Sequence, residues 1–316
     1  MTLAISASQL VRTFGDKNAV DGVDISIAEG EIYGFLGPNG AGKSTMVKML
    51  TSLLRPTSGS ATVAGFDVAM QSDQVRLRIG VALQDAALDL KQTGREILDL
   101  QGRFYGLSKS ERAARIEELI PLIDIGAAFD QRIGTYSGGM KRRLDLAVAL
   151  VHNPAVLFLD EPTTGLDPTS RTKVWDEVRR LNTELGMTIF LTTQYLEEAD
   201  VLANRVGIIA GGKIVAEGTP DELKRTVGTD VVVVRPVGDP AVVPGALSSV
   251  AGVESIDVRG HEVLVSVANG ASAISPIALA LNEAGVAVSN LMLRTSTLDD
   301  VFLTLTGGHL QEEAAA

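Results

Sequence analysis

A glycine-rich stretch between a predicted strand and a predicted helix constrains this chain more than any other feature. Residues 37–45 read Gly-Pro-Asn-Gly-Ala-Gly-Lys-Ser-Thr and match the pattern G-x-x-x-x-G-K-[ST]. Residues 31–36 before it, apolar after Glu31, are typical of a buried strand, and residues 46–50 after it are typical of the beginning of a helix. A strand, a turn and a helix in this order predict an α/β domain with a doubly wound sheet.

The residue types in this stretch suit the binding of phosphate. Glycines let several backbone N–H groups point at one anion, and the following helix directs its positive end to the same place. The side chain of Lys43 can reach the β- and γ-phosphates, and the hydroxyl of Ser44 can ligate Mg²⁺. A chance glycine-rich turn is the alternative, and the flanking strand and helix argue against it. The predicted phosphate-binding residues are Gly37, Pro38, Asn39, Gly40, Ala41, Gly42, Lys43, Ser44 and Thr45.

The composition excludes several classes of function. The chain has 28 Lys and Arg against 39 Asp and Glu, and a net charge of -11 argues against nucleic acid as a partner. It has no cysteine, which excludes disulfides, thiolate catalysis and cysteine-type zinc sites. No apolar run approaches the roughly 18–20 residues that span a bilayer, and the N-terminus shows no export signal. A role at a membrane would therefore require another chain to cross it.

The pattern of apolar runs and turn residues predicts two domains in the 316 residues. Residues 1–227 are expected to form the α/β domain, with a helical subdomain at about 85–152 that contains helices opened by capping boxes at Thr93 and Ser108. Pro121 is expected to end the second of these helices. Residues 228–306 alternate as β-α-β-β-α-β followed by a helix, which predicts a small ferredoxin-like α+β domain. Residues 307–316 are expected to be a flexible tail.

Two adjacent acids follow a second strand that is expected to be buried. Residues 155–159 are all apolar, and Asp160 and Glu161 come directly after them. In a doubly wound sheet this strand end lies close to the phosphate loop. Asp160 is then expected to hold Mg²⁺ through water, and Glu161 to polarise an attacking water. Adjacent acids also occur in ordinary solvated turns, and this motif alone does not separate the two interpretations.

A second candidate anion loop opens a later helix. Ser137, Gly138 and Gly139 precede an amphipathic run that begins at Arg142, so their N–H groups are also free to donate to an anion. A nucleotide held by the first loop of one chain does not need a second loop from that chain. The simplest hypothesis is that this loop caps ATP bound by another copy of the domain.

With these motifs in this order, about the first 225 residues resemble the ABC ATPases. The resemblance implies a RecA-like core with a helical subdomain and an antiparallel β subdomain, an ATPase that binds ATP and Mg²⁺, and catalytic roles for Lys43, Glu161 and Gln194. The further site residues that it implies are the adenine-stacking Phe14, the Q-loop residue and Mg²⁺ ligand Gln84, the signature residues Tyr136, Ser137, Gly138, Gly139 and Met140, the D-loop residues Thr164, Gly165, Leu166 and Asp167, and the switch residue Gln194.

Four stretches carry a closer resemblance, to the ATP-binding subunits of daunorubicin-resistance exporters: residues 98–107, 192–200, 217–223 and 298–303. This resemblance implies two copies that close around two ATP–Mg²⁺ and drive a separate integral-membrane permease. The implied location is the cytoplasmic face of the membrane, and the implied cargo is a hydrophobic drug, antibiotic or lipid. The direction of transport rests on the resemblance, and neither the cargo nor the permease can be identified from this sequence.

The sequence departs from the usual ABC pattern at four positions. Tyr136 and Met140 stand where Leu and Gln are usual, and Phe14 stands where Tyr is usual. Gln194 replaces the usual His; its amide can donate to a phosphate oxygen but cannot carry a proton, which places more of the chemistry on Glu161. Two alternatives follow: a catalytically weak regulatory ATP-binding protein, or a soluble ABC-type ATPase that acts on nucleic acid or ribosomes. The single phosphate loop and the acidic balance argue against the second.

Overall fold

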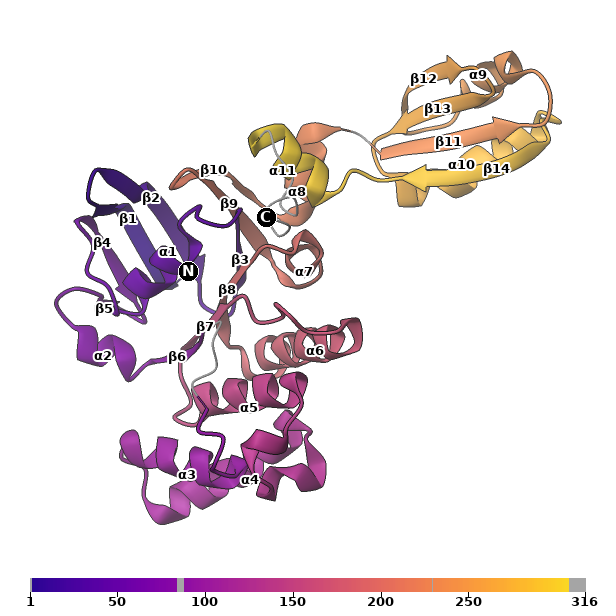
Figure 1. The fold of residues 1–316 in the computed structure, drawn as a ribbon. Coiled ribbons are helices and arrows are strands. Elements are labelled where there is room, and N and C mark those ends of the chain that lie inside the picture. Colours follow the sequence, from indigo (N-terminus) through magenta and orange to yellow (C-terminus); the bar gives the residue numbers. More distant parts are fainter. Residues whose placement is uncertain (1, 84–87, 229, 307–316) are drawn as a thin grey trace. The chain divides into compact units, whose positions relative to one another are not determined.

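The computed structural model describes residues 2–83, 88–228 and 230–306. The chain forms two compact units, of which the first ends at Pro220 and the second begins at Asp221 (Figure 1). The predicted domain limit at residue 227 lies one helix later, because helix α8 (Pro220–Val227) falls in the second unit.

A six-stranded sheet forms the centre of the first unit. Its strand order is β10-β9-β3-β8-β7-β6, with all neighbours parallel except β9 and β10. These two form a hairpin, which the glycine pair Gly211-Gly212 between two apolar runs predicts. Strands β3, β7 and β8 are buried along their whole length, as expected for a parallel sheet covered on both faces. The strands are β3 (Ile32–Leu36), β6 (Ile79–Ala82), β7 (Val156–Asp160), β8 (Thr188–Thr193), β9 (Arg205–Ala210) and β10 (Lys213–Gly218).

An antiparallel sheet, in the order β2-β1-β4-β5, shares a core with one face of the central sheet. Phe190 is in the middle of this core, with the ring centroids of Tyr33, Phe35 and Phe158 at 5.9, 5.5 and 5.6 Å. The sequence of residues 60–68 predicts a single strand, and the structure contradicts this prediction. The segment contains two strands, because the turn at Ala64 and Gly65 has positive φ at both residues. The elements are β1 (Leu3–Phe14), β2 (Lys17–Ala28), β4 (Ser58–Val63), β5 (Phe66–Asp67), α1 (Lys43–Leu50) and α2 (Ser72–Arg76).

The helical subdomain lies at one end of the first unit (Figure 1). Both predicted capping boxes are present, at Thr93 and at Ser108. The predicted helix end at Pro121 is wrong: α4 continues through it and ends at Asp124, which adopts a left-handed φ of 45°. A proline near the end of a helix removes one hydrogen bond of the last turn only. The elements are α3 (Gly94–Phe104), α4 (Lys109–Ile123), the 3₁₀ helices η1 (Gly126–Asp130) and η2 (Ile133–Thr135), and α5 (Gly138–Leu150). Helices α6 (Pro168–Leu185) and α7 (Leu196–Leu202) follow β7 and β8.

The second unit contains an antiparallel sheet in the order β12-β13-β11-β14. Helices α9 and α10 pack their apolar side chains against one face of it. The chain order β-α-β-β-α-β and this strand order are those of a ferredoxin-like domain, as predicted. The elements are β11 (Asp230–Pro236), η3 (Pro240–Val242), α9 (Val243–Leu247), β12 (Val253–Arg259), β13 (Glu262–Val267), α10 (Gly270–Glu283), β14 (Val288–Arg294) and α11 (Leu298–Thr306). Across the described residues of both units, no helix combines the length and apolar character needed to cross a bilayer.

Candidate nucleotide site

Three separate parts of the chain meet at the carboxyl edge of the central sheet. The phosphate loop follows β3, Glu161 follows β7 and Gln194 follows β8, and β8 lies between β3 and β7. Because parallel strands all end at the same edge, the three segments surround one cavity of about 370 Å³. The described residues that line this cavity are Ala19, Pro38, Asn39, Gly40, Gly42, Lys43, Ser44, Thr45, Glu161 and Gln194.

The phosphate loop requires glycine where its backbone turns into α1. Gly42 has a φ of 115°, and a Cβ at this position would lie 2.3 Å from the backbone oxygen of Ala19. Only glycine meets both conditions. The first turn of α1 therefore begins at Lys43 with its N–H groups at the cavity, which is the arrangement that binds an anion at a helix N-terminus.

Lys43 and Glu161 are the two buried charges of the cavity. The Nζ atom of Lys43 lies 3.3 Å from Oε1 of Glu161 and donates to the carbonyl oxygen of Gly37 at 2.8 Å. Less than a tenth of either residue is exposed to solvent. A buried ion pair of this kind is costly to break from one side only, so each side chain helps to keep the other at the cavity.

The backbone of Glu161 is held by a residue that the sequence analysis missed. The N–H of Glu161 donates to the carbonyl oxygen of Thr192 at 3.0 Å and to its Oγ1 at 3.1 Å. The same hydroxyl donates to Oδ1 of Asp160. Thr192 is fully buried on β8, and the only sequence signal is that it is one of three threonines in a strand whose other residues are apolar.

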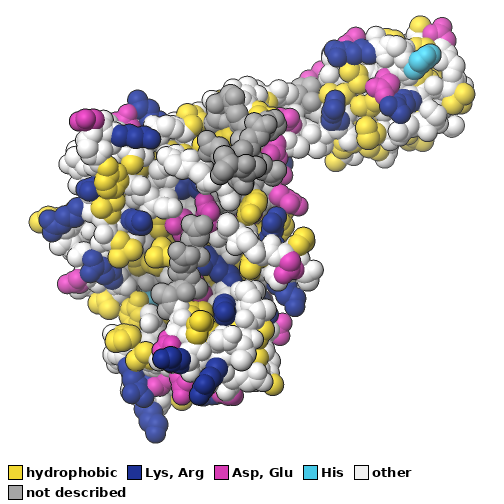
Figure 2. Space-filling view, in the orientation of Figure 1, with side chains coloured by type: hydrophobic (Ala, Val, Ile, Leu, Met, Phe, Trp, Pro, Cys, Tyr) yellow, Lys and Arg dark blue, Asp and Glu magenta, His cyan; other side chains and the backbone are white. Residues whose placement is uncertain are grey.

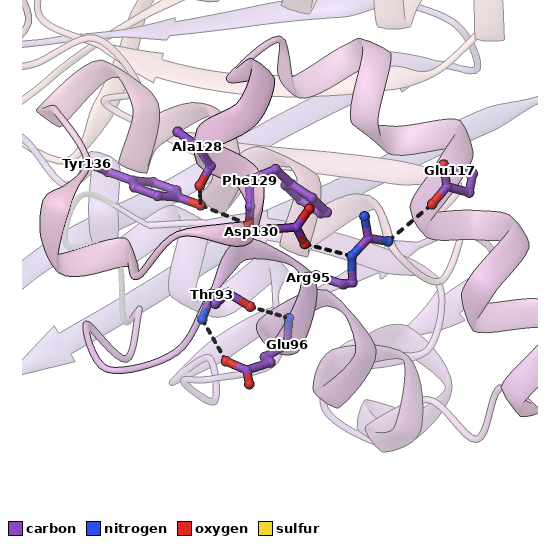
Figure 3. A network of polar contacts seen from close by, with 8 residues as sticks. All are labelled: Thr93, Arg95, Glu96, Glu117, Ala128, Phe129, Asp130 and Tyr136. Carbon is purple, nitrogen blue, oxygen red and sulfur yellow. Dashed lines mark hydrogen bonds and ion pairs between the residues drawn. The ribbon is translucent and has the colours of Figure 1, made fainter.

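The signature segment is fixed from two sides. Ser137 caps α5 by accepting from the N–H of Met140 at 3.2 Å. The hydroxyl of Tyr136 donates to the carbonyl oxygens of Ala128 at 2.7 Å and Phe129 at 3.2 Å, as Figure 3 shows. The usual leucine at this position has no group that can make these bonds. The departure at Tyr136 therefore adds a polar anchor for the signature segment.

Around this anchor, Arg95 on α3 holds η1 in place (Figure 3). It forms ion pairs with Asp130 at 2.8 Å and with Glu117 at 3.1 Å, and its guanidinium lies 5.1 Å from the ring centroid of Phe129. These two acids hold the pKa of Arg95 above its usual value through hydrogen bonds, Asp130 more than Glu117.

The signature segment and the D-loop lie side by side within the chain. A Cβ on Gly138 would come within 3.9 Å of Leu166, and one on Gly139 within 2.9 Å of Ser170. Asp167 caps α6 by accepting from the N–H of Ser170, and it also accepts from the hydroxyl of Ser170 at 2.6 Å. The hydroxyl bond first, and the N–H bond second, lower the pKa of Asp167. No residue of either segment is among the described residues that line the cavity.

Phe14, the predicted adenine-stacking residue, is not part of the described cavity lining. Phe14 ends β1, about half of its surface is exposed, and the guanidinium of Arg12 lies 4.6 Å from its ring centroid. Gln84 lies outside the described residues, between Leu83 and Leu88.

Comparison with known proteins agrees with this geometry. Residues 20–164 match the family model "ABC transporter", and residues 218–306 match the model "ATP-binding protein DrrA1-3-like, C-terminal domain". The chain is 46% identical to the daunorubicin resistance ATP-binding protein DrrA2 of Streptomyces coeruleorubidus, over 99% of this chain and 98% of that protein. This chain belongs to the ATP-binding proteins of ABC transporters. The resemblance predicted from the sequence is thereby confirmed, and the family makes the protein an ATPase coupled to transport.

Other members of this ABC family align along nearly their whole length. The doxorubicin resistance ATP-binding protein DrrA of Mycobacterium tuberculosis (strain ATCC 25618 / H37Rv) is 41% identical over 96% of this chain and 94% of that protein. The Nod factor export ATP-binding protein I of Rhizobium meliloti (strain 1021) is 38% identical over 98% of this chain and 90% of that protein.

Solved ABC cassettes share the fold of the first unit. A dimeric post-hydrolysis structure of the ATP-binding cassette MJ0796 with ADP and Pi has a TM-score of 0.62 and 26% identity, covering 68% of this chain and 98% of that one. The structure of cbiO1 from Clostridium perfringens, part of an ABC transporter complex, has a TM-score of 0.66 and 26% identity, covering 71% of this chain and 91% of that one. The predicted fold class is confirmed by these structures.

Proposed function

We propose that two copies of this chain close on two molecules of ATP with Mg²⁺ and so drive a separate integral-membrane subunit that exports a hydrophobic drug, antibiotic or lipid. One observation carries the first part. The signature segment and the D-loop lie together in the chain, yet neither lines the cavity that contains Lys43 and Glu161. A second copy, placed head to tail, would bring its Ser137–Gly139 loop to this cavity and complete the surroundings of the γ-phosphate.

Within this arrangement each cavity residue has a role that its chemistry allows. The N–H groups of the phosphate loop and Lys43 would bind the β- and γ-phosphates. Glu161 would polarise the attacking water, and the amide of Gln194 would donate to a γ-phosphate oxygen. Ser44, Gln84 and Asp160 would hold Mg²⁺, with Asp160 acting through water, and the ion would neutralise charge on the phosphates. The oxygen-rich set fits this hard cation, and Ser44 lines the cavity.

The export role is supported by what the relatives are named for. Two of the three are named for resistance to anthracycline drugs, and the third for export of Nod factor. Selectivity for cargo would lie in the membrane subunit. The ATP-binding chain would supply only the conformational change driven by ATP binding and hydrolysis. We place it at the cytoplasmic face of the membrane, held there by that subunit.

The charge distribution gives no support to a role on nucleic acid. On the face shown in Figure 2, Lys and Arg side chains are interspersed with Asp and Glu. Together with the net charge of -11, this differs from the clustered basic surface that a nucleic-acid binder presents.

The test is Glu161→Gln, which keeps the size and hydrogen bonding of the side chain but removes the base. ATP binding should persist, hydrolysis should fall by about 10²–10⁴-fold, which is the usual contribution of a general base, and the ATP-bound chain should accumulate as a dimer. Equilibrium ATP binding, steady-state ATPase with the membrane partner, and sedimentation with and without ATP measure the three properties. Hydrolysis at the native rate would show that Glu161 is not the base. A chain that stays monomeric with ATP would contradict the shared site.

A further inference from the structure

One buried guanidinium connects the signature helix to the catalytic edge of the sheet. Arg142 lies in the second turn of α5, and only 9% of its surface is exposed. Its Nε donates to the carbonyl oxygen of Pro162 at 2.8 Å, and its two terminal nitrogens donate to those of Leu83 at 2.6 Å and Asp160 at 3.3 Å. Three donors of one rigid planar group thus bond to backbone oxygens of two loops.

The three carbonyl groups bound by Arg142 belong to residues next to proposed site residues. Asp160 and Pro162 are the residues on either side of Glu161, and Leu83 directly precedes Gln84. Both loops follow neighbouring parallel strands, β7 and β6, at the edge that contains the cavity. Arg142 therefore binds the backbone next to Glu161, the proposed base, and next to Gln84, a proposed ligand of Mg²⁺.

The backbone at Glu161 needs such support. Its φ is 48°, in the left-handed region that a residue with a Cβ adopts at a cost of about 1–2 kcal/mol. Strained residues of this kind persist only where the surroundings over-determine them. Here the N–H of Glu161 is bound by Thr192, and the carbonyls on both sides of Glu161 are bound by Arg142.

The charge of Arg142 is balanced locally. Oδ2 of Asp145, one turn further along α5, lies 3.2 Å from a terminal nitrogen of Arg142. Burial lowers the pKa of Arg142 and raises that of Asp145 to about 6. A lysine could keep the charge but not the three hydrogen bonds, because its ammonium is a point charge without the planar fork of arginine.

We propose that Arg142 is a positioning residue that holds the backbone of Glu161 in its catalytic orientation and couples it to the signature helix. The inference rests on the proposed function, in which Glu161 polarises water and Ser137 faces the ATP of the other copy. Since α5 begins directly after Ser137, engagement of the signature loop by the partner's nucleotide moves the helix on which Arg142 sits. When the signature loop of one chain contacts the nucleotide bound by the partner, Glu161 of that same chain is aligned at the nucleotide that this chain binds itself.

The experiment compares Arg142→Lys with Arg143→Lys, its neighbour on the same helix. Arg143 donates to the carbonyl oxygen of Asp124 and serves as the matched control for loss of an arginine from α5. In the complex with the membrane partner, Arg142→Lys should lower kcat by about tenfold or more, since misplacement of a catalytic group by about 1 Å can cost 10²-fold. ATP binding and KM should stay within about threefold of wild type, and Arg143→Lys should keep kcat within about twofold.

A second variant separates positioning from folding. Arg142→Met combined with Asp145→Leu replaces the whole buried pair by apolar groups of similar size, a change that is often neutral for stability. This chain should fold and bind ATP but lose kcat as Arg142→Lys does. Asp145→Asn, which keeps the three carbonyl contacts of Arg142, should keep kcat within about threefold of wild type.

A coupling measurement decides the mechanism. If Arg142 acts through Glu161, adding Arg142→Lys to Glu161→Gln should cause no further loss of the residual hydrolysis. The inference would be overturned if the losses of hydrolysis caused by Arg142→Lys and Glu161→Gln multiplied fully in the double variant. It would also be overturned if Arg142→Lys, or Arg142→Met with Asp145→Leu, folded and kept the native kcat. Neither result bears on the proposed function, which is tested by Glu161→Gln alone, through its rate of hydrolysis and its dimerisation with ATP.

Discussion

Single hydroxyl groups matter at the residue scale, and Thr192 is the sharpest case. Its buried hydroxyl accepts from the N–H of Glu161 and donates to Asp160, so it orients both acids. Thr192→Val keeps the shape and removes both bonds. We expect kcat to fall by about tenfold, because the acids lose part of their preorganisation, while ATP affinity changes little. Steady-state ATPase activity measures this change, and Thr172→Val, at an exposed position of α6, is the control. An unchanged kcat in Thr192→Val would show that Thr192 only fills space.

Glu177 on α6 makes stability depend on pH. Burial raises its pKa to about 7, and its Oε1 is buried without a hydrogen-bond partner among the described residues. The folded state therefore favours the protonated form, whereas the unfolded chain ionises at about 4.5. The folded state binds more protons between these values, so the cost of ionising Glu177 accumulates as pH rises from about 4.5 to 7.

Glu177→Gln removes this cost. The variant should have a higher midpoint of thermal unfolding than wild type at pH 8, and a smaller gain at pH 5.5, where the folded wild type is already largely protonated. Thermal melts at the two pH values measure the difference. An equal gain at both would mean that the effect is not ionisation, and Asp176→Asn on the exposed side of α6 is the control.

The sequence predicts the residues that touch phosphate better than those that hold them in place. Lys43 and Ser44 are recognisable because the chemistry of phosphate fixes both residue type and spacing. Arg142 and Thr192 are not, because their partners are backbone atoms 59 and 31 residues away in sequence. The fold, and not the local sequence, brings these side chains to those atoms, so no spacing marks these positions.

At the scale of elements, strand β6 depends on a glycine to approach α5. A Cβ on Gly80 would lie 2.4 Å from the backbone oxygen of Ala149, which cannot move aside as a side chain can. Gly80→Ala should destabilise the first unit by about 1–3 kcal/mol, as overpacking of a core does. Gly245→Ala on α9 has no atom within 4 Å of the new Cβ and should be neutral or slightly stabilising. Denaturant unfolding measures both, and equal stability of Gly80→Ala would show that α5 shifts freely.

Helices and strands can be predicted from the sequence where contacts between neighbouring residues determine where they begin and end. Both capping boxes fix the beginnings of α3 and α4, since the side chains bond within one turn. Helix α2 was not predicted, because five residues with one buried side chain, Val75, give no helical period. Its existence depends on contacts with β5 and β6, which the sequence pattern does not contain.

At the scale of the whole molecule, the sequence indicates two units, and the placement of the motifs in the first unit supports the proposal that two copies share each site. The parallel sheet gathers the phosphate loop, Glu161 and Gln194 at one edge, because its strand order brings β3, β8 and β7 together. The same chain presents the signature segment and D-loop elsewhere on the first unit. Each chain would thus contribute one half to each of two sites.

Mixing two inactive variants tests this division directly. Lys43→Ala disables the phosphate loop of a chain. Gly138→Asp places a negative charge in the signature loop, which would repel the phosphates of the nucleotide bound by the partner. The Asp side chain fits its own chain, because a Cβ on Gly138 meets nothing closer than Leu166 at 3.9 Å.

A mixed pair contains one site built from an intact phosphate loop and an intact signature loop, and one site with both halves broken. Half of the pairs in an equal mixture are mixed, so ATPase activity should recover to about a quarter of wild type if the sites act independently. Recovery should be smaller, but above the level of the separate variants, if Arg142 couples the sites, because the intact site uses Glu161 of the chain whose signature loop is blocked. Each variant alone should be inactive under the same conditions with the membrane partner. If each chain instead completed its own site, no chain in the mixture would have both loops intact, and activity would stay at the level of the separate variants.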